Sequence, residues 1–223
     1  MTLSIHQPQY IPWIPYFSKI YHSDIFVLLD HVQFQKNGLQ NRNYIFNKKE
    51  EIRLTLPVHV HLGNSIKDVT ISQQNILSKH WTSIELAYKK APFFHEVSEF
   101  LFIIYSNSYS LLCELNCDLI NAILNYLGIK TKMLRSSEMN VTGEKSGLIL
   151  NICQQLHADR YLTGTGGLDY LQKEDFEKEK IEIQLLEYPK KKYVQANAQD
   201  HFIENLSILD LLFNTGKKAI NYL

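Results

Sequence analysis

The chain has 223 residues, of which 45% are hydrophobic and 21% are charged, proportions typical of a globular protein rather than a disordered one. Its 23 basic and 23 acidic side chains balance, which argues against a general nucleic-acid binder, because such proteins carry a basic excess. No apolar stretch is long enough to span a bilayer, and Met1 to Gln9 do not resemble a signal peptide. We therefore expect one α/β domain over residues 1–223, with no membrane span and a cytoplasmic location.

Three cysteines are scattered along the chain, which fits buried free thiols in a reducing compartment. Cys113 and Cys117 lie four residues apart on a predicted helix. No second pair of ligands follows them, so the sequence predicts no metal site.

The first thirty residues predict a βαβ unit. Thr2 to His6 has the apolar character of a buried strand, and the three prolines that follow predict a loop. A short helix is expected over 13–22, and Ile25 to Leu29 is an apolar run of strand length. A continuous apolar strand is typical of a parallel sheet that is covered on both faces.

The remaining elements follow in the same alternating style. The polar segment 33–43 is expected to be a loop. Strands are predicted at 52–60, 66–71, 130–134, 160–162 and 181–186, and helices at 78–90, 96–109, 111–127, 146–157, 169–178 and 206–213. Because strands and helices alternate at both ends of the chain, we expect an α/β fold: a mostly parallel, Rossmann-like sheet with helices on both faces.

Parallel sheets bind ligands at the carboxyl ends of their strands, and polar residues follow the first two predicted strands. His6 closes the first strand and Asp30 closes the second, so both are candidate catalytic residues, His6 as a base and Asp30 as a group that holds or activates the acceptor. A hydrogen-bonded structural histidine is the alternative for His6. Gln7 and Tyr10 follow His6 and are candidate binding residues.

A string of amides with one guanidinium follows Asp30. A phosphate or carboxylate site would use the forked donors of Arg42 with the charge of Lys36. A solvated turn is the alternative interpretation. The candidate binding residues here are Gln33, Lys36, Gln40, Asn41, Arg42 and Asn43.

A glycine-rich turn follows the strand at 160–162 and precedes a predicted helix. Gly164, Gly166 and Gly167 would let backbone N–H groups approach an anion, with Asp169 and Tyr170 close behind. The turn fits neither the dinucleotide fingerprint nor the Walker A pattern. A tight strand-to-helix turn without a ligand is the alternative.

Several runs of residues together resemble the WbqC-like proteins over essentially the whole chain. They include His6 to Trp13, Tyr16-Phe17, Lys19, Asp24, Phe26 to Asp30, Gln33, Lys36, Gln40 to Asn43, Leu56 to Val58, Trp81, Ser136 to Glu138, Tyr161-Leu162, Gly164, Gly166-Gly167, Asp169 to Leu171, Phe176, Phe202, Asn205 to Asn214 and Gly216. The resemblance implies a place in bacterial surface-polysaccharide (O-antigen) biosynthesis and an aminoacyl or acyl transferase activity.

The opening strand, loop, helix and strand also resemble the start of HIGH-type nucleotidyltransferases. Those enzymes place an H-x-G-H motif on the first helix, where this chain has Trp13 to Tyr16. Both histidines are absent, which argues against adenylyl transfer.

Two kinds of function therefore stay open. The first is a transferase that moves an aminoacyl (for example glycyl) or acyl group onto an activated sugar. The second is a non-catalytic module that binds a sugar nucleotide or a carrier protein, and a degenerate nucleotidyltransferase is a further alternative. The sequence indicates no resident cofactor; an acyl thioester or a nucleotide-containing substrate would fit, and it does not define the oligomeric state.

Overall fold

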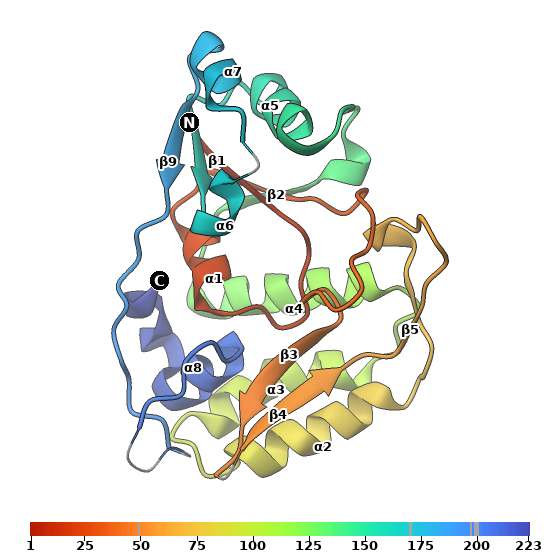
Figure 1. Cartoon of the computed structure of the whole chain (residues 1–223). Helices are drawn as coiled ribbons and strands as arrows, with labels where there is room; N and C mark the ends of the chain where they lie inside the picture. The colour runs from red at the N-terminus through yellow and green to blue at the C-terminus, as the bar shows by residue number, and fades with distance from the viewer. Residues whose placement is uncertain (49, 170, 197, 199–200) are drawn as a thin grey trace.

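A five-stranded parallel sheet forms the centre of the protein in a computed structural model that describes residues 1–48, 50–169, 171–196, 198 and 201–223 (Figure 1). The strands lie in the order β7-β2-β1-β8-β9, and each neighbouring pair is parallel. Their bounds are β1 Thr2–His6, β2 Ile25–Leu28, β7 Lys132–Arg135, β8 Arg160–Thr163 and β9 Glu182–Leu185. The expected Rossmann-like α/β fold is confirmed.

Helices cover both faces of this sheet, and two small antiparallel pairs lie in the long insertion between β2 and β7. None of the helices in the described ranges is long and apolar enough to cross a membrane. The helices are α1 Ile14–Tyr21, α2 Ile76–Tyr88, α3 Phe94–Ser106, α4 Leu112–Leu127, α5 Lys145–Gln155, α6 Thr165–Leu168, α7 Lys173–Lys178 and α8 Ile208–Thr215, and the remaining elements are β3 Arg42–Phe46, β4 Glu51–Thr55, β5 Val58–His59, β6 Thr70–Ile71 and the 3₁₀ turns η1 Ile66–Asp68, η2 Ser136–Glu138 and η3 Gly216–Tyr222.

Strand periodicity divides the core into two layers. Leu3, Ile5 and Val27 pack with α5 and α7 on one face of the sheet. Phe26 and Leu28 pack on the other face in a larger cluster with residues of α1 to α4 and α8. Side chains of successive strand residues point to opposite faces, so both faces of these short strands must be apolar. That requirement explains the continuous apolar runs in the sequence.

The direction in which strands are added to the sheet reverses at β1. The chain places β2 and then β7 on one side of β1, and then crosses over to place β8 and β9 on the other side. In open α/β sheets, ligands bind outside the carboxyl ends of the strands at such a reversal. The two segments that leave this point are the one after His6 and the one after Thr163.

Three predicted segments differ from the structure. The strand expected over 66–71 is the 3₁₀ turn η1 followed by the two-residue strand β6. The polar run 33–43 is not a loop throughout, because β3 begins within it at Arg42, where Asn41 and Asn43 are buried and hydrogen-bonded. The helix expected over 169–178 begins only at Lys173, as α7, and the glycine turn before it contains the short helix α6. Tyr170 lies outside the described residues. By contrast, α4 matches its prediction closely and ends at Gly128, whose φ of 71° is left-handed.

Gly216, where α8 ends, provides a test of the packing. Its φ is +58°, and a Cβ there would lie 2.4 Å from Cδ1 of Phe93. We expect Gly216→Ala to lower the free energy of unfolding by about 1–3 kcal/mol, because it adds both backbone strain and overpacking. Urea denaturation measures the change.

Gly147→Ala is the matched control, because Gly147 lies in α5 and a Cβ added there would meet no atom within 4 Å. This control is expected to raise the free energy of unfolding by about 0.5–1 kcal/mol through helix propensity. Equal effects of the two substitutions would contradict the packing described around Phe93.

Candidate functional site

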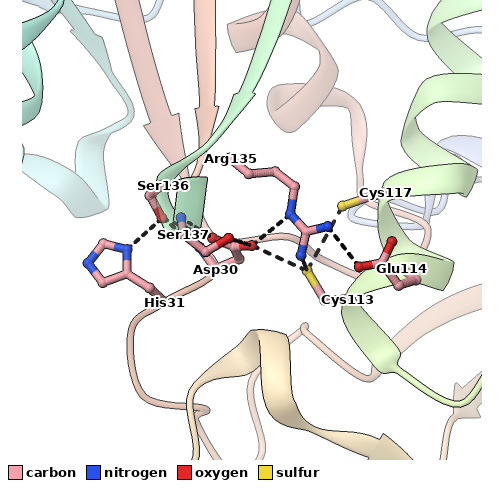
Figure 2. Close-up of polar contacts among 8 residues, drawn as sticks. All are labelled: Asp30, His31, Cys113, Glu114, Cys117, Arg135, Ser136 and Ser137. Atoms are coloured by element: carbon pink, nitrogen blue, oxygen red, sulfur yellow. Dashed lines mark hydrogen bonds and ion pairs between the residues drawn. The ribbon is translucent and has the colours of Figure 1, made fainter. Parts of the chain in front are cut away.

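The carboxyl ends of β2 and β7 lie side by side and bring two polar segments together. Leu28 pairs with Arg135 at the end of the two strands. Asp30 follows β2, and Ser136 and Ser137 begin the η2 turn directly after β7. Figure 2 shows the side chains of Arg135, Ser136 and Ser137 converging on the Asp30 carboxylate.

The Asp30 carboxylate is fully buried and is saturated with hydrogen-bond donors. Oδ1 accepts from the Ser137 backbone N–H at 2.8 Å and from Ser136 Oγ at 3.1 Å. Oδ2 accepts from Ser137 Oγ at 2.7 Å and from Arg135 Nε at 2.8 Å. Burial alone would raise the pKa of Asp30, but the hydrogen bonds from Ser137 and Arg135 outweigh it and hold that pKa below its usual value. Asp30 is therefore an ionised group that fixes its neighbours, rather than one with an oxygen free for a substrate.

Arg135 connects this cluster to α4. Its Nη1 donates to Glu114 Oε1 at 2.7 Å, and its Nη2 lies 3.5 Å from Cys113 Sγ. The two carboxylates outweigh burial and raise the pKa of Arg135. Cys113 Sγ also lies 3.9 Å from Cys117 Sγ; this contact, together with burial, raises the pKa of the Cys113 thiol, so Cys113 is not a thiolate nucleophile. All three cysteines are buried free thiols, as predicted.

His31 is attached to the same cluster through Ser136. Its Nδ1 lies 2.7 Å from Ser136 Oγ, which also accepts from the Asp30 backbone N–H at 3.0 Å. Because the single Ser136 proton is drawn to the Asp30 carboxylate, Nδ1 of His31 must be the donor in this contact. The assignment leaves a lone pair on Nε2, which has no partner among the described residues. His31 is half-buried, so a ligand can reach it.

His6, the predicted base, lies in a different environment at the end of β1. Its Nδ1 lies 3.1 Å from the Gln7 carbonyl oxygen, and its ring packs edge-on against Tyr16 with a centroid distance of 4.9 Å. Burial, helped by the nearby Lys19 charge, lowers the pKa of His6 to about 3. His6 is therefore a neutral imidazole at physiological pH, with Nδ1 protonated because a carbonyl accepts from it.

Lys19 of α1 is a buried cation directly below β1. Its side chain is 6% exposed, and its Nζ donates to the Ile5 carbonyl oxygen at 3.1 Å. Burial lowers the pKa of Lys19 to about 7. A lysine is seldom buried without a carboxylate, and no salt bridge of Lys19 is found within the described part of the chain.

Most of the predicted amide string faces inward. Gln40 Nε2 donates to Gln7 Oε1 at 2.7 Å, which joins two of the candidate binding residues. Asn41 donates to the Leu56 carbonyl, and Asn43 donates to the carbonyls of Tyr10 and Ile11. These amides satisfy the backbone of the surrounding loops.

The cationic members of the amide string are more accessible. Arg42 Nη1 donates to Asn37 at 3.3 Å on the surface. Gln33 and Lys36 line a cavity of about 290 Å³ together with His61 and Asn64. None of the residues around Asp30 lines this cavity, but the charge of Lys36 makes it a candidate anion site.

The glycine turn lies beside β1 on the other side of the reversal point. Gly164 leads into α6, and both Gly164 and Gly166 have open space around them. At Gly167 a Cβ would lie 2.1 Å from Thr163 Oγ1, so a larger residue there would force the Thr163 side chain to move. Asp169 follows as an exposed residue.

Tyr10 is part of the core. Its hydroxyl bonds to His80 Nδ1 at 2.8 Å and to the Tyr105 hydroxyl at 2.9 Å, and burial raises its pKa. The ring is completely buried, so in this structure Tyr10 supports the loop after β1 and does not contact solvent.

Across the described ranges, no cluster of three or more His, Cys, Asp or Glu side chains is suited to a metal.

The predicted residues lie in separate groups: His6, Asp30 and Gly164 follow strands of the central sheet, residues 33–43 belong to the insertion, and Tyr10 is in the core. His6 and Asp30 follow neighbouring strands, with the Leu29 N–H bonded to the His6 carbonyl at 2.8 Å. Sequence reasoning misses His31, Arg135, Ser136 and Ser137 as site residues. The rule that identifies Asp30 also applies to Ser136 and Ser137, since they directly follow a strand of the same sheet.

Substitution of Asp30 tests the cluster as a structural unit. We expect Asp30→Asn to lower the free energy of unfolding at pH 7 by about 2–4 kcal/mol, because Arg135 and the two serines lose an anionic acceptor. The folded pKa lies below the unfolded one, so the contribution is complete above the unfolded pKa near 3.8 and is lost as the pH falls through the folded value. Urea titrations from pH 3 to pH 7 should therefore converge for variant and wild type at the acid end. Exposed Asp68→Asn is the control, expected within about 0.5 kcal/mol.

Substitution of Lys19 tests the buried cation. The folded pKa of about 7 lies below the ordinary lysine value of 10.5, so folding releases a proton and stability should rise with pH between those values. We expect Lys19→Met to be more stable than wild type at pH 7 by about 2 kcal/mol. The stability of the variant should also increase much less with pH than that of the wild type. Thermal unfolding at pH 7, 8.5 and 10 measures both effects. If stability changed with pH in the same way in both proteins, the burial of an ionisable lysine would be contradicted.

Comparison with known proteins places the chain in a family. The model of the WbqC-like protein family matches residues 7–222. The uncharacterized protein Rv1507c of Mycobacterium tuberculosis is 33% identical over 225 residues, which cover 99% of this chain and 96% of that protein. No solved structure matches the chain significantly. The predicted resemblance is thereby confirmed: the chain belongs to the WbqC-like protein family.

Proposed function

We propose that the chain is a transferase that moves an acyl or aminoacyl group, such as glycyl, onto an amino or hydroxyl group of an activated sugar. The observation that carries the proposal is the hydrogen-bonded series from Asp30 through Ser136 to His31 Nδ1, at the carboxyl edge of the sheet. Such a series presents an oriented imidazole with an available Nε2, which acyl transfer requires of a general base.

His31 would act as the base in the proposed step. Its Nε2 takes the proton of the acceptor amine or hydroxyl as the acceptor's lone pair attacks the acyl carbonyl carbon. The bond from that carbon to the sulfur or oxygen of the donor then breaks, and the leaving group receives the proton from His31. Ser136 and Asp30 keep the ring oriented and stabilise its transient positive charge, because Asp30 is ionised.

Other candidate residues have supporting roles in this proposal. Lys36 and Gln33, in the cavity that they form with His61 and Asn64, would hold the anionic part of a substrate. His6 is held neutral, so its role is to accept or donate a hydrogen bond that orients the substrate. Backbone N–H groups of the turn around Gly164 and Gly166 would face the developing oxyanion.

The biological setting is part of the same proposal. The WbqC-like family resembled by the sequence is associated with surface-polysaccharide biosynthesis, and activated sugars are made in the cytoplasm. We therefore assign the chain to that compartment and to O-antigen-type assembly. A non-catalytic sugar-nucleotide or carrier-protein module is the second candidate, and the inward orientation of Gln40, Asn41 and Asn43 favours it, because few polar groups remain for a complete catalytic centre.

Substitution of His31 tests the catalytic role. With a glycyl or acyl thioester donor and a sugar-nucleotide acceptor identified by mass spectrometry, His31→Ala should lower kcat by roughly 10²–10⁴-fold, because a general base contributes that much. Ser136→Ala should cause a smaller loss, since it releases the ring without removing it. Exposed His95→Ala, on α3, is the control and should retain wild-type turnover.

Wild-type turnover by His31→Ala would refute the proposal that His31 is the general base. Tight binding of a sugar nucleotide without any change in its mass, whatever the acyl donor supplied, would favour the binding module instead. Circular dichroism and urea denaturation check that the variants are folded, so that a loss of activity can be interpreted.

A further inference from the structure

A second concave site lies away from the His31 cluster, and its lining differs in character. It is a pocket of about 140 Å³ between three segments: the start of α1, residues 188–193 after β9, and residues 202–206 before α8. Figure 1 shows the chain after β9 running down one side of the molecule toward α8. Two of the three segments leave the sheet from carboxyl strand ends, those of β1 and β9.

The pocket combines cations with ring surfaces. Its lining includes Lys190, Lys191 and Lys192 beside Trp13, Tyr188 and Phe202. The Nζ of Lys192 lies 6.0 Å from the centroid of the Phe202 ring, so cation and ring are adjacent in space as well as in the lining. No salt bridge of these three lysines is found within the described ranges, and Glu204 is the single carboxylate in the lining. Three lysines against one glutamate leave a cationic rim.

The walls of the pocket are fixed by hydrogen bonds beneath it. Tyr193 donates from its hydroxyl to the buried Asp210 at 2.7 Å, and Gln195 donates to the same oxygen at 2.7 Å. The third segment is tied to the loop before α1, because the Ile208 N–H donates to the Pro12 carbonyl at 2.8 Å and Trp13 forms an isolated antiparallel β-bridge with Ser207. The pocket is therefore preformed, which lowers the entropy cost of binding a ligand.

From this geometry we infer that the pocket binds an organic diphosphate, with its flat or apolar end against Trp13 and Phe202 and its phosphates on the lysine rim. The volume suits one ring or a short hydrocarbon unit, and lysine is a common phosphate partner. The same chemistry comes from two sources, a nucleoside diphosphate and an isoprenyl diphosphate.

Titration calorimetry of the purified full-length chain tests the inference with three probes: uridine diphosphate, farnesyl diphosphate and inorganic diphosphate. We expect one of the organic probes to bind at least about tenfold more tightly than inorganic diphosphate, and the tighter one identifies the source. If both organic probes bound no more tightly than inorganic diphosphate, the inference would be overturned, because the ring side chains of the pocket would then contribute nothing.

Matched variants locate the binding. The double substitution Lys191→Ala and Lys192→Ala should lower the affinity for the tighter-binding probe by about tenfold or more, since phosphate contacts are charge-assisted. Lys89→Ala with Lys90→Ala removes an equally exposed, adjacent lysine pair at the end of α2 and should change affinity by less than about twofold. Equal losses from both pairs would mean a general charge effect and would overturn the site.

Tryptophan fluorescence gives a readout that is independent of charge. The chain has two tryptophans, Trp13 in the pocket and Trp81, which packs against Phe102 and Tyr105. The fluorescence change on adding the better probe should disappear in Trp13→Phe and persist in Trp81→Phe. The opposite result places the ligand elsewhere and overturns the inference. These binding measurements need no turnover, so they stand even if the His31 assay shows no transfer.

Discussion

The buried carboxylate of Asp30 is the group on which the arrangement of the site depends. A fully buried anion is unfavourable unless donors replace its hydration, and here four donors do so from Arg135, Ser136 and Ser137. Those donors come from β7 and its η2 turn, whereas Asp30 follows β2. The electrostatic requirement therefore fixes the relative positions of two strand ends that are more than a hundred residues apart in sequence.

The backbone around Asp30 and the side chain of Arg135 also tie the long insertion to the sheet. The Lys67 N–H donates to the Asp30 carbonyl, and the Ile66 N–H donates to that of Val32, both at 2.9 Å. Arg135 reaches Glu114 at the beginning of α4. A segment that could have formed an independent lobe is thus attached at the carboxyl edge, and it supplies His61 and Asn64 to the cavity that Gln33 and Lys36 also line.

Local patterns and long-range contacts differ in how far the sequence reveals them. The apolar runs of β1 and β2 and the stripe of α4 are local, so the parallel sheet and its helices can be predicted from periodicity. The amides Asn41 and Asn43 resemble a solvated or ligand-binding string in the sequence, because their real partners, Leu56 and Ile11, are distant and no local pattern indicates them. Asp30 is identified by its place at a strand end, but its role depends on partners from β7 that the sequence does not connect to it.

The two histidines at this edge show why position alone does not identify a base. His6 closes a strand, yet its imidazole is packed against Tyr16 and lies near the Lys19 charge, which together with burial keeps the pKa near 3. A ring with so low a pKa is a weak base, because it holds a proton poorly at neutral pH. His31 has one nitrogen bonded to a serine that in turn bonds to an ionised carboxylate, so its ring is oriented and its Nε2 has no partner among the described residues. The environment of each ring is set by residues distant in sequence, which is why the place of a histidine at a strand end does not by itself indicate its role.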